Sequence, residues 1–529
     1  MRGVCRGARR ASGVTRGFLA SMSVRRVMGI ETEYGISVPG SPSANPMVLS
    51  GDVVTTYAAS RGIRPAQASW DYADEAPLRD ARGFDMGRGA AHSSQLTDIE
   101  DPTMANVVLT NGARLYVDHA HPEYASPEVT NPRDAVVWDK AGELVMREAV
   151  QRLATVPPGV NLYKNNTDGK GASYGTHENY LMSRRTPFAR IISQLTPFFV
   201  VRQVMSGSGR VGIGVDSRTT GYQIAQRSDF FEAEVGLETT LKRPIINTRD
   251  EPHAVADLYR RLHVILGDAN HCDVANLVKM GSTSLVLAMI EDDAFTTDLS
   301  VRSPVPTLRA ISHDPTLRST IELVDGRSIR SVELLRTFHE LAARYVDNKW
   351  GADVDAETTE VLHWWDTVLT ALEGDPMDAR RWVDWVAKLS VLEAYRERDS
   401  LGWGDPRLKA VDIQWSDVRA DRGLAHRLAA TGRVEVLVPE AEAAAAMDNA
   451  PEDTRAWFRG ACLRKFPESV VAASWDSVVV EVPGERSLQR IPILEPLRGT
   501  KDAVGDLVDG ASDIRSLLES LAAVERAAD

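Results

Sequence analysis

A short run of alternating side chains, NGARLYVD at residues 111–118, constrains the fold of this chain more than any other feature. Successive side chains of a β-strand point to opposite faces, so Arg114, Tyr116 and Asp118 share one face and Leu115 and Val117 take the other. The apolar face belongs against a core. The opposite face aligns a cation, a phenol and a carboxylate, which indicates either an exposed, salt-bridged strand or a surface that binds a ligand.

A second expected strand, at residues 28–38, carries paired carboxylates. Glu31 and Glu33 lie two residues apart and point to one face, whereas Ile30, Thr32 and Tyr34 point to the other. Two neighbouring carboxylates repel each other unless a cation lies between them, and oxygen ligands of this kind suit Mg²⁺. The pattern therefore predicts a Mg²⁺ site or, alternatively, a solvated strand edge.

Three further segments add polar groups that bind metals or phosphates. His121, Glu123 and Glu128 follow the 111–118 strand directly. The segment at residues 165–179, with an expected loop at 166–174, contains several glycines, which permit close backbone approach to a ligand, and its polar groups include asparagines, an aspartate, His177 and Glu178. A plain hairpin loop is the alternative interpretation of this segment.

Beyond residue 246, Arg249 and Arg261 are candidates to grip phosphate oxygens through paired hydrogen bonds. His263 is a candidate to bind metal or to hold a carboxylate, although a histidine beside an apolar run is more often structural.

Composition and spacing exclude several classes of protein. None of the motifs has the spacing of a Ser-His-Asp triad, a zinc site or a Rossmann glycine fingerprint. The net charge is −13, and residues 1–26 hold seven arginines and no acid, so the remainder carries −13 − 7 = −20, which argues against nucleic-acid binding. No apolar stretch is long enough to span a membrane. The three scattered cysteines indicate a reducing, cytoplasmic location.

The pattern of elements predicts a large unit followed by a smaller one. Residues 1–26 are expected to be a disordered basic extension, order is expected to begin near Val27, and residues 71–105 look like a long inserted loop. Strands are expected at 109–118, 161–165, 176–182, 210–213, 221–226, 245–248 and 475–482, and a helix capped by Asn131 is expected after residue 131. Helical patterns, with clustered tryptophans that suit a core, dominate 331–395. We expect a catalytic domain at 27–430 and a small C-terminal domain at 431–529.

Longer phrases of the sequence resemble one known family. GIETEYGIS, NGARLYVDHAHPEY, YKNNTDGKGASYGTHENYL, INTRDEPHA, YRRLHVILGDAN, WDSVVVEVPG and RIPILEPLRG are similar to segments of the Dop/PafA family, which acts on the small protein modifier Pup and is distantly related to glutamine synthetase. The likeness runs from about Met28 into the C-terminal region. The insertion WDYADEAPLRDARGFD and the motif HAHPEY resemble the Dop branch, whereas IETEYG is closer to the ligase branch.

The resemblance implies an α+β fold. Its large domain would have a curved, mostly antiparallel sheet flanked by helices, as in glutamine synthetase, and a small C-terminal α/β domain would follow. It implies metal ligands at Glu31, Tyr116 and Glu123, nucleotide contacts at Arg114, Ser126 and Trp475, and an essential aspartate at Asp118. Ser126 stands where the ligase has threonine. By extension, we assign metal binding to Glu33, His177 and His263 and nucleotide binding to Arg249 and Arg261.

The implied function is that of an ATP- and Mg²⁺-dependent amide hydrolase. Such an enzyme deamidates the C-terminal Gln of Pup to Glu and cleaves the isopeptide bond between Pup and a lysine, with Pup, pupylated proteins and, indirectly, the bacterial proteasome as partners. Asp118 would serve either as the nucleophile or as the base that activates a water. The inserted loop would gate substrate entry or regulate turnover. The rival interpretations are a Pup ligase, a non-catalytic adaptor for Pup or the proteasome, and a small-molecule carboxylate–amine ligase.

Overall fold

A six-stranded antiparallel sheet organises the computed structural model, which describes residues 24–63, 69–73, 75–91, 96 and 105–528. Its strand order places the first strand of the chain at the centre of the sheet, so that segments far apart in sequence meet on it. In that order the strands are β15 (Tyr259–Val264), β10 (Thr176–Ser183), β1 (Met28–Glu33), β8 (His121–Ala125), β7 (Arg114–Asp118) and β6 (Asn106–Val108).

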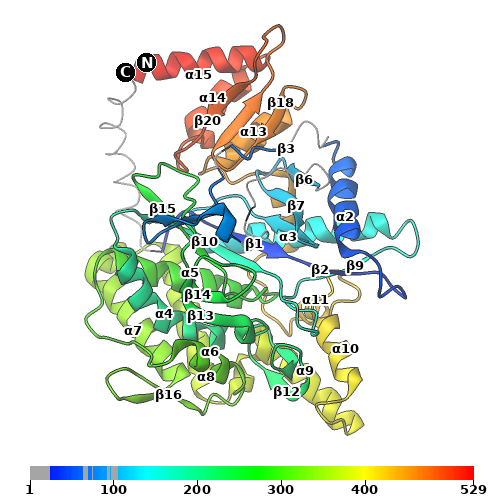
Figure 1. Cartoon of the computed structure of the whole chain (residues 1–529), viewed down its shortest axis with the longest axis vertical. Helices are drawn as coiled ribbons and strands as arrows, with labels where there is room; N and C mark the ends of the chain where they lie inside the picture. The colour runs from blue at the N-terminus through cyan, green and yellow to red at the C-terminus, as the bar shows by residue number, and fades with distance from the viewer. Residues whose placement is uncertain (1–23, 64–68, 74, 92–95, 97–104, 529) are drawn as a thin grey trace.

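Helices cover one face of this sheet because the alternate residues of each strand are apolar on that side. Ile30, Leu115, Tyr180 and Leu262 are all buried there, against helices α3 (Pro132–Leu153), α4 (Phe188–Ser206) and α5 (Asp273–Glu291) (Figure 1). The predicted cap of α3 is confirmed, since the Asn131 side chain accepts a hydrogen bond of 3.0 Å from the backbone N–H of Asp134.

Among the described helices, α5 is long and apolar enough to cross a membrane, but 94% of that window is buried inside the protein. That burial is what the core helix of a folded domain shows.

The middle of the chain forms a helical layer below the sheet in Figure 1. The tryptophans expected in a core are partly confirmed, since Trp365 and Trp385 are fully buried and Trp364 and Trp382 pack against them from partly exposed positions. The elements of this part are β11 (Arg210–Ile213), β12 (Thr219–Gln223), β13 (Phe231–Gly236), β14 (Arg243–Asn247), α6 (Pro304–Ser312), β16 (Thr320–Glu322), β17 (Ser328–Arg330), α7 (Ser331–Trp350), α8 (Ala356–Glu373), α9 (Asp384–Asp399), α10 (Pro406–Trp415) and α11 (Leu424–Ala430).

The C-terminal part of the chain has its own hydrophobic core. Its sheet has the order β20 (Gln489–Pro492), β19 (Ser477–Val480), β18 (Val470–Ala473) and β3 (Ser69–Trp70), so the start of the expected insertion supplies one strand. Helices α13 (Ala456–Lys465), α14 (Lys501–Gly510) and α15 (Ile514–Ala528) complete this part. Helix α12 (Glu440–Asp448) instead packs in the large core. We therefore propose that the boundary between the two domains lies nearer residue 450 than 430.

Two details differ from the sequence-based expectation. The continuous strand expected over 109–118 is a hairpin, in which β6 and β7 flank a turn at residues 109–113; Gly112 has a φ of 80° there, and a side chain would collide with the backbone of Ala456. Order also begins before Val27. Val24 is buried, and Arg26 forms an ion pair of 2.6 Å with Glu291. The remainder of the basic extension, residues 1–23, lies outside the described residues.

Other short elements follow the expectations only in part, because a helix and a pair of short strands lie between residues 46 and 85, where none was expected. The remaining elements are β2 (Gly35–Ser37), which pairs with β9 (Asn161–Tyr163), helix α2 (Pro46–Ser60), and the pair β4 (Arg79–Asp80) and β5 (Phe84–Asp85). Strand β11 has the expected bounds, whereas β12 and β14 begin two residues earlier than expected.

Candidate active site

The face of the sheet that points away from α3, α4 and α5 carries the polar side chains expected from sequence. The strand register explains why they meet. Glu31 on β1 lies opposite His177 on β10, and Glu33 lies opposite Glu123 on β8. Glu123 in turn lies opposite Tyr116 on β7. Directly opposed residues of neighbouring strands have their side chains on the same face, so these acids and rings form one continuous surface.

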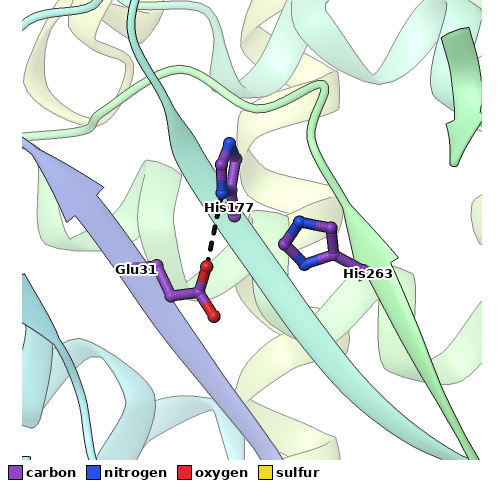
Figure 2. A group of neighbouring side chains, drawn as sticks. All are labelled: Glu31, His177 and His263. Atoms are coloured by element: carbon purple, nitrogen blue, oxygen red, sulfur yellow. Dashed lines mark hydrogen bonds and ion pairs between the residues drawn. The ribbon is translucent and has the colours of Figure 1, made fainter. Parts of the chain in front are cut away.

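One group on this surface combines a carboxylate with two imidazoles. Figure 2 shows Glu31, His177 and His263 converging from β1, β10 and β15. One ligand atom from each lies within 4.8 Å of the others, and His177 Nδ1 is 3.3 Å from Glu31 Oε2. Asn179 donates a hydrogen bond of 2.9 Å to Glu31 Oε1 and accepts one from His263 or its neighbour Arg261.

The charges within this group are complementary. Burial opposes ionisation of Glu31, but His177, His263 and Arg261 outweigh it and lower the pKa of this carboxyl. Burial, reinforced by Arg261, lowers the pKa of His263 well below its usual range. The group therefore offers an ionised carboxylate and a neutral imidazole, both of which are able to bind a cation.

A second group contains three carboxylates, those of Glu33, Asp118 and Glu123, again with ligand atoms within 4.8 Å of one another. The Tyr116 hydroxyl donates a short hydrogen bond to Glu123 Oε1. Glu123 Oε2 is buried and has no hydrogen-bond partner among the described residues. Burial, together with Asp118, Glu33 and Glu31, raises the pKa of Glu123 well above its usual range.

Such crowding of acids fits a cation. Like-charged carboxylates in one site force one of them to stay protonated unless a positive ion offsets their repulsion. The donors are mainly oxygens, and one buried oxygen lacks a partner, which is the donor set that a hard ion such as Mg²⁺ prefers. The residues present therefore fit a Mg²⁺ ion.

Asp118 ends β7 and is partly open to solvent, with 30% of its side chain exposed. Its Oδ1 lies 2.9 Å from His119 Nδ1. Burial opposes ionisation, but His119, His177 and Arg114 lower the pKa of Asp118, while the Asp118 carboxylate raises the pKa of His119 to about 9. Asp118 is therefore an ionised, accessible carboxylate at neutral pH.

Gly175 holds the two groups together. Its backbone N–H donates a short hydrogen bond to Glu33 Oε1. A Cβ at this position would lie 2.3 Å from His177 Nε2 and 2.7 Å from Glu33 Oε1, so the site has room only for glycine. One of the glycines expected to approach a ligand thus lies against the side chains of His177 and Glu33.

A pocket of about 540 Å³ opens beside Glu31 and extends towards the C-terminal part of the chain. Its lining includes four of the residues expected from sequence, Glu31, Ser126, Arg261 and Trp475. Ser126 Oγ accepts a hydrogen bond of 3.0 Å from the backbone N–H of Ile30, which fixes the hydroxyl at the pocket wall.

Arg114 and Arg249 lie outside the pocket lining in the described chain. The Arg114 guanidinium is sandwiched between the rings of Trp70 and Tyr116, at 4.0 Å and 3.9 Å from their centroids. Trp70 in turn packs edge-on against Trp475, with ring centroids 5.2 Å apart. Arg114 therefore connects the metal-binding face to the pocket wall through stacked rings.

Arg249 and Arg261 share one acid. Glu251 pairs with Arg249 and lies 3.4 Å from Arg261 Nη2. The described part of the insertion docks on the same segment, since the backbone N–H of Ala76 donates a hydrogen bond of 2.6 Å to Glu251 Oε1. The insertion thus lies next to the two arginines at the rim of the site.

An internal ion pair supports the Trp475 wall, the side of the pocket that Trp475 lines. Glu128 accepts hydrogen bonds from Arg455 Nε at 2.8 Å and from Arg459 Nη2 at 2.5 Å. Arg459 also donates to the carbonyls of Gly112 and Trp475. Burial opposes ionisation, but the two arginines lower the pKa of Glu128 to about 2.

Several of these contributors were missed from sequence. Asn179 ends the segment 165–179 that was singled out for its polar groups, but it was given no role of its own, although it shares a strand face with His177. His119 adopts a φ of 53°, and no local pattern indicated that turn. Arg459 lies 331 residues from Glu128, and no sequence signal indicated that pair.

Comparison with protein-family models decides the family. The model described as Pup-ligase protein matches residues 26–479 of this chain. The chain belongs to the Pup-ligase protein family. This finding confirms the resemblance seen in the motifs.

Relatives within the family differ in their likeness to the chain. A depupylase of Acidothermus cellulolyticus is 60% identical over 500 residues, which cover 94% of this chain and 99% of the relative. A Pup deamidase/depupylase of Mycobacterium tuberculosis is 53% identical over 95% of this chain and 100% of its own length.

Two solved structures share the fold. The Pup ligase PafA in complex with Pup has a TM-score of 0.76 and 31% identity, covering 93% of this chain and 92% of that one. PafA in complex with ADP has a TM-score of 0.69 and 35% identity, covering 77% and 89%. The expected α+β fold, with a mostly antiparallel sheet flanked by helices, is confirmed.

Proposed function

We propose that this chain is an ATP- and Mg²⁺-dependent amide hydrolase that converts the C-terminal Gln of Pup to Glu and cleaves the isopeptide bond between Pup and a target lysine. The observation that carries the proposal is the ionised, accessible carboxylate of Asp118 beside the crowded acids Glu33 and Glu123. Identity of 60% with a depupylase, against 38% with a Pup–protein ligase of Acidimicrobium ferrooxidans, favours hydrolysis over ligation.

Both reactions replace an amine on the same kind of carbonyl. In deamidation the leaving group is ammonia, and in isopeptide cleavage it is the lysine amine. Asp118 either attacks the side-chain carbonyl carbon, forming an anhydride that water then opens, or removes a proton from the water that attacks. In each case the C–N bond breaks and the departing amine takes a proton. Asp118 returns to the amine the proton that it took from water in the base route, whereas in the nucleophilic route His119 supplies the proton and regains one from the water that opens the anhydride. His119 holds its proton beside Asp118 and keeps that carboxylate ionised.

Glu33 and Glu123, with Tyr116 bonded to Glu123, would hold Mg²⁺ in the carboxylate group, and Glu31 with His177 and His263 offers a neighbouring donor set for a divalent cation. When bound, the ion supplies positive charge that stabilises the developing oxyanion. Arg114 remains stacked between its two rings and adds a fixed positive charge near the same face.

The pocket lined by Ser126, Arg261 and Trp475 is proposed as the ATP site. The PafA structure in complex with ADP supports nucleotide binding by this fold. Because amide hydrolysis is downhill, ATP would act as a bound cofactor and not as a consumed fuel. Arg249 is assigned to the same site as a weaker expectation, since Glu251 already holds its guanidinium.

Pup, pupylated proteins and the proteasome pathway follow as partners. Neither nucleic acid nor a membrane is required by the proposal, and a reducing cytoplasm suits the two buried free thiols, Cys272 and Cys462. Regulation of turnover by the inserted loop stays a prediction.

Exchange of Asp118 tests the proposal. Asp118→Asn keeps the size of the side chain and removes its negative charge, so deamidation of Pup should fall below detection while ADP still binds. Asp325→Asn, in an exposed turn, is the matched control and should retain full activity. Near-normal turnover by Asp118→Asn would overturn the assignment, and intact Pup binding without any conversion in the unmodified protein would instead favour an adaptor.

A further inference from the structure

A further cluster of side chains that are able to bind a metal lies beside α3, outside the candidate active site. Glu143 on α3, His271 in the segment that precedes α5, and His426 on α11 each offer a ligand atom, all within 4.8 Å of one another. None of the three takes part in the proposed hydrolysis. They line a pocket of about 1070 Å³ that is separate from the candidate active site.

His271 is the least explained residue of this cluster. Only 3% of its side chain is exposed, and neither ring nitrogen has a hydrogen-bond partner among the described residues. The nearest carboxylate oxygen, Glu143 Oε2, lies 3.6 Å from Nδ1. A buried polar group without a hydrogen-bond partner destabilises a folded protein, so this ring indicates a ligand that is bound to it.

The distances within the cluster suit a tetrahedral ion. His426 Nε2 is 3.0 Å from Glu143 Oε1, and His271 Nδ1 is 3.6 Å from Glu143 Oε2. With metal–ligand bonds of about 2.0–2.2 Å, the ligand atoms of a tetrahedral zinc site lie about 3.3–3.6 Å apart. The two distances above, which involve different oxygens of the Glu143 carboxylate, are close to this range. The two rings are nearly perpendicular, at 89°, with centroids 5.6 Å apart, so their edges approach one point from different directions.

The chemistry of the donors selects the ion. Two imidazole nitrogens and one carboxylate oxygen suit Zn²⁺ and similar transition metals, whereas Mg²⁺ prefers oxygen donors alone. Both ring nitrogens of His271 are buried without a hydrogen-bond partner among the described residues, so its ring has a nitrogen to offer to an ion. We propose that Glu143, His271 and His426 form a second metal site that binds a Zn²⁺-type divalent cation and leaves its fourth position open to the pocket.

Positive groups near the cluster do not block this site. Lys164 Nζ lies 3.3 Å from Glu143 Oε2 but also forms an ion pair of 2.8 Å with Asp139. Lys164 therefore keeps a carboxylate partner when Glu143 turns to an ion. Arg147 Nη2 lies 3.7 Å from Glu143 Oε1 and likewise has Glu440 as a second partner. The bound ion would connect α3, the start of α5 and α11.

Zinc binding by the full-length protein tests the proposal. Metal-free protein is dialysed against Zn²⁺ and the bound metal is measured, for the unmodified chain and for the variants His271→Gln and His426→Gln. Because His177 and His263 on the catalytic face are also able to bind Zn²⁺, all measurements are repeated in a His263→Gln background. The exposed His363→Gln, on α8, is the matched control.

We expect each cluster variant to lose one equivalent of Zn²⁺, or to bind it at least about ten-fold more weakly, in both backgrounds, while His363→Gln binds normally. Cobalt substituted for zinc should give the visible absorption of a tetrahedral site that His426→Gln abolishes. If His271→Gln fails to fold, His426→Gln still tests the proposal. The side chain of His426 is 18% exposed and lies on a short helix, so its exchange should not prevent folding. Equal zinc content and affinity in His426→Gln and the unmodified chain, or loss of zinc only with His263→Gln, would overturn the proposal.

Discussion

The ion pair between Glu128 and Arg459 offers a quantitative test of how the C-terminal part supports the site. Arg459→Met keeps the length of the apolar stem and removes the guanidinium. Arg459 is fully buried, and its loss leaves the Glu128 carboxylate with Arg455 alone. It also removes the donors to two buried carbonyls, those of Gly112 and Trp475.

The expected magnitude follows from these contacts. Removing one partner of a buried ion pair typically costs about 3–5 kcal/mol, because it leaves an uncompensated charge. Retention of Arg455 reduces that cost, whereas the two carbonyls left without donors increase it by about 1–3 kcal/mol each when no water replaces the guanidinium. We therefore expect Arg459→Met to lower the free energy of unfolding of the C-terminal part by about 3–5 kcal/mol. The Trp475 wall should loosen, and ADP should bind more weakly.

Urea denaturation followed by circular dichroism gives the loss of stability, and hydrogen exchange of β19 reports where it occurs. Arg464→Met, at the exposed end of the same helix, is the matched control and should change stability by less than about 0.5 kcal/mol. The double variant Glu128→Gln/Arg459→Met should cost less than the sum of its single changes, since the two residues interact directly. Stability of Arg459→Met equal to that of the control, or strict additivity in the double variant, would refute the reasoning.

Three further predictions concern single residues of the site. Glu31→Ala should weaken binding of ATP with Mg²⁺ at least about ten-fold in a calorimetric titration, and unchanged affinity would remove Glu31 from the site. Gly175→Ala should lower kcat by about 100-fold because its Cβ displaces His177 and Glu33, whereas Gly402→Ala, with open space around it, should leave kcat unchanged. The pKa of Glu128 falls from 4.5 to about 2 on folding, so the ionised carboxylate stabilises the fold fully above pH 4.5, and this stabilisation is lost as the pH falls towards 2. The difference in unfolding free energy between the unmodified chain and Glu128→Gln should therefore shrink over that range. A difference that stays constant with pH would contradict this prediction.

Alternation along single strands made much of the site predictable from sequence. The faces of β1 and β7 follow directly from the two-residue period, which correctly grouped Glu31 with Glu33 and Arg114 with Tyr116 and Asp118. Local capping chemistry likewise predicted the start of α3 at Asn131. These features depend on neighbouring residues only.

Contacts between distant segments were not predictable in the same way. No local pattern places β1 between β10 and β8, yet that order brings His177 next to Glu31 and Glu123 next to Glu33. The turn within residues 109–113 was missed because the apolar residues on both sides of it have the pattern of one continuous strand. The ion pair between Arg249 and Glu251 also depends on tertiary packing, so it could not be predicted from the sequence.

One mass-spectrometric measurement decides whether this surface hydrolyses amides. Pup ending in Gln is incubated with the protein, ATP and Mg²⁺, and the masses of Pup and the amount of ADP are followed in the same sample. We predict that Pup gains the mass difference between a carboxamide and a carboxylic acid, while far less ADP than product accumulates. Unchanged Pup, Pup joined to a lysine, or ADP formed in step with product would contradict the proposed hydrolysis.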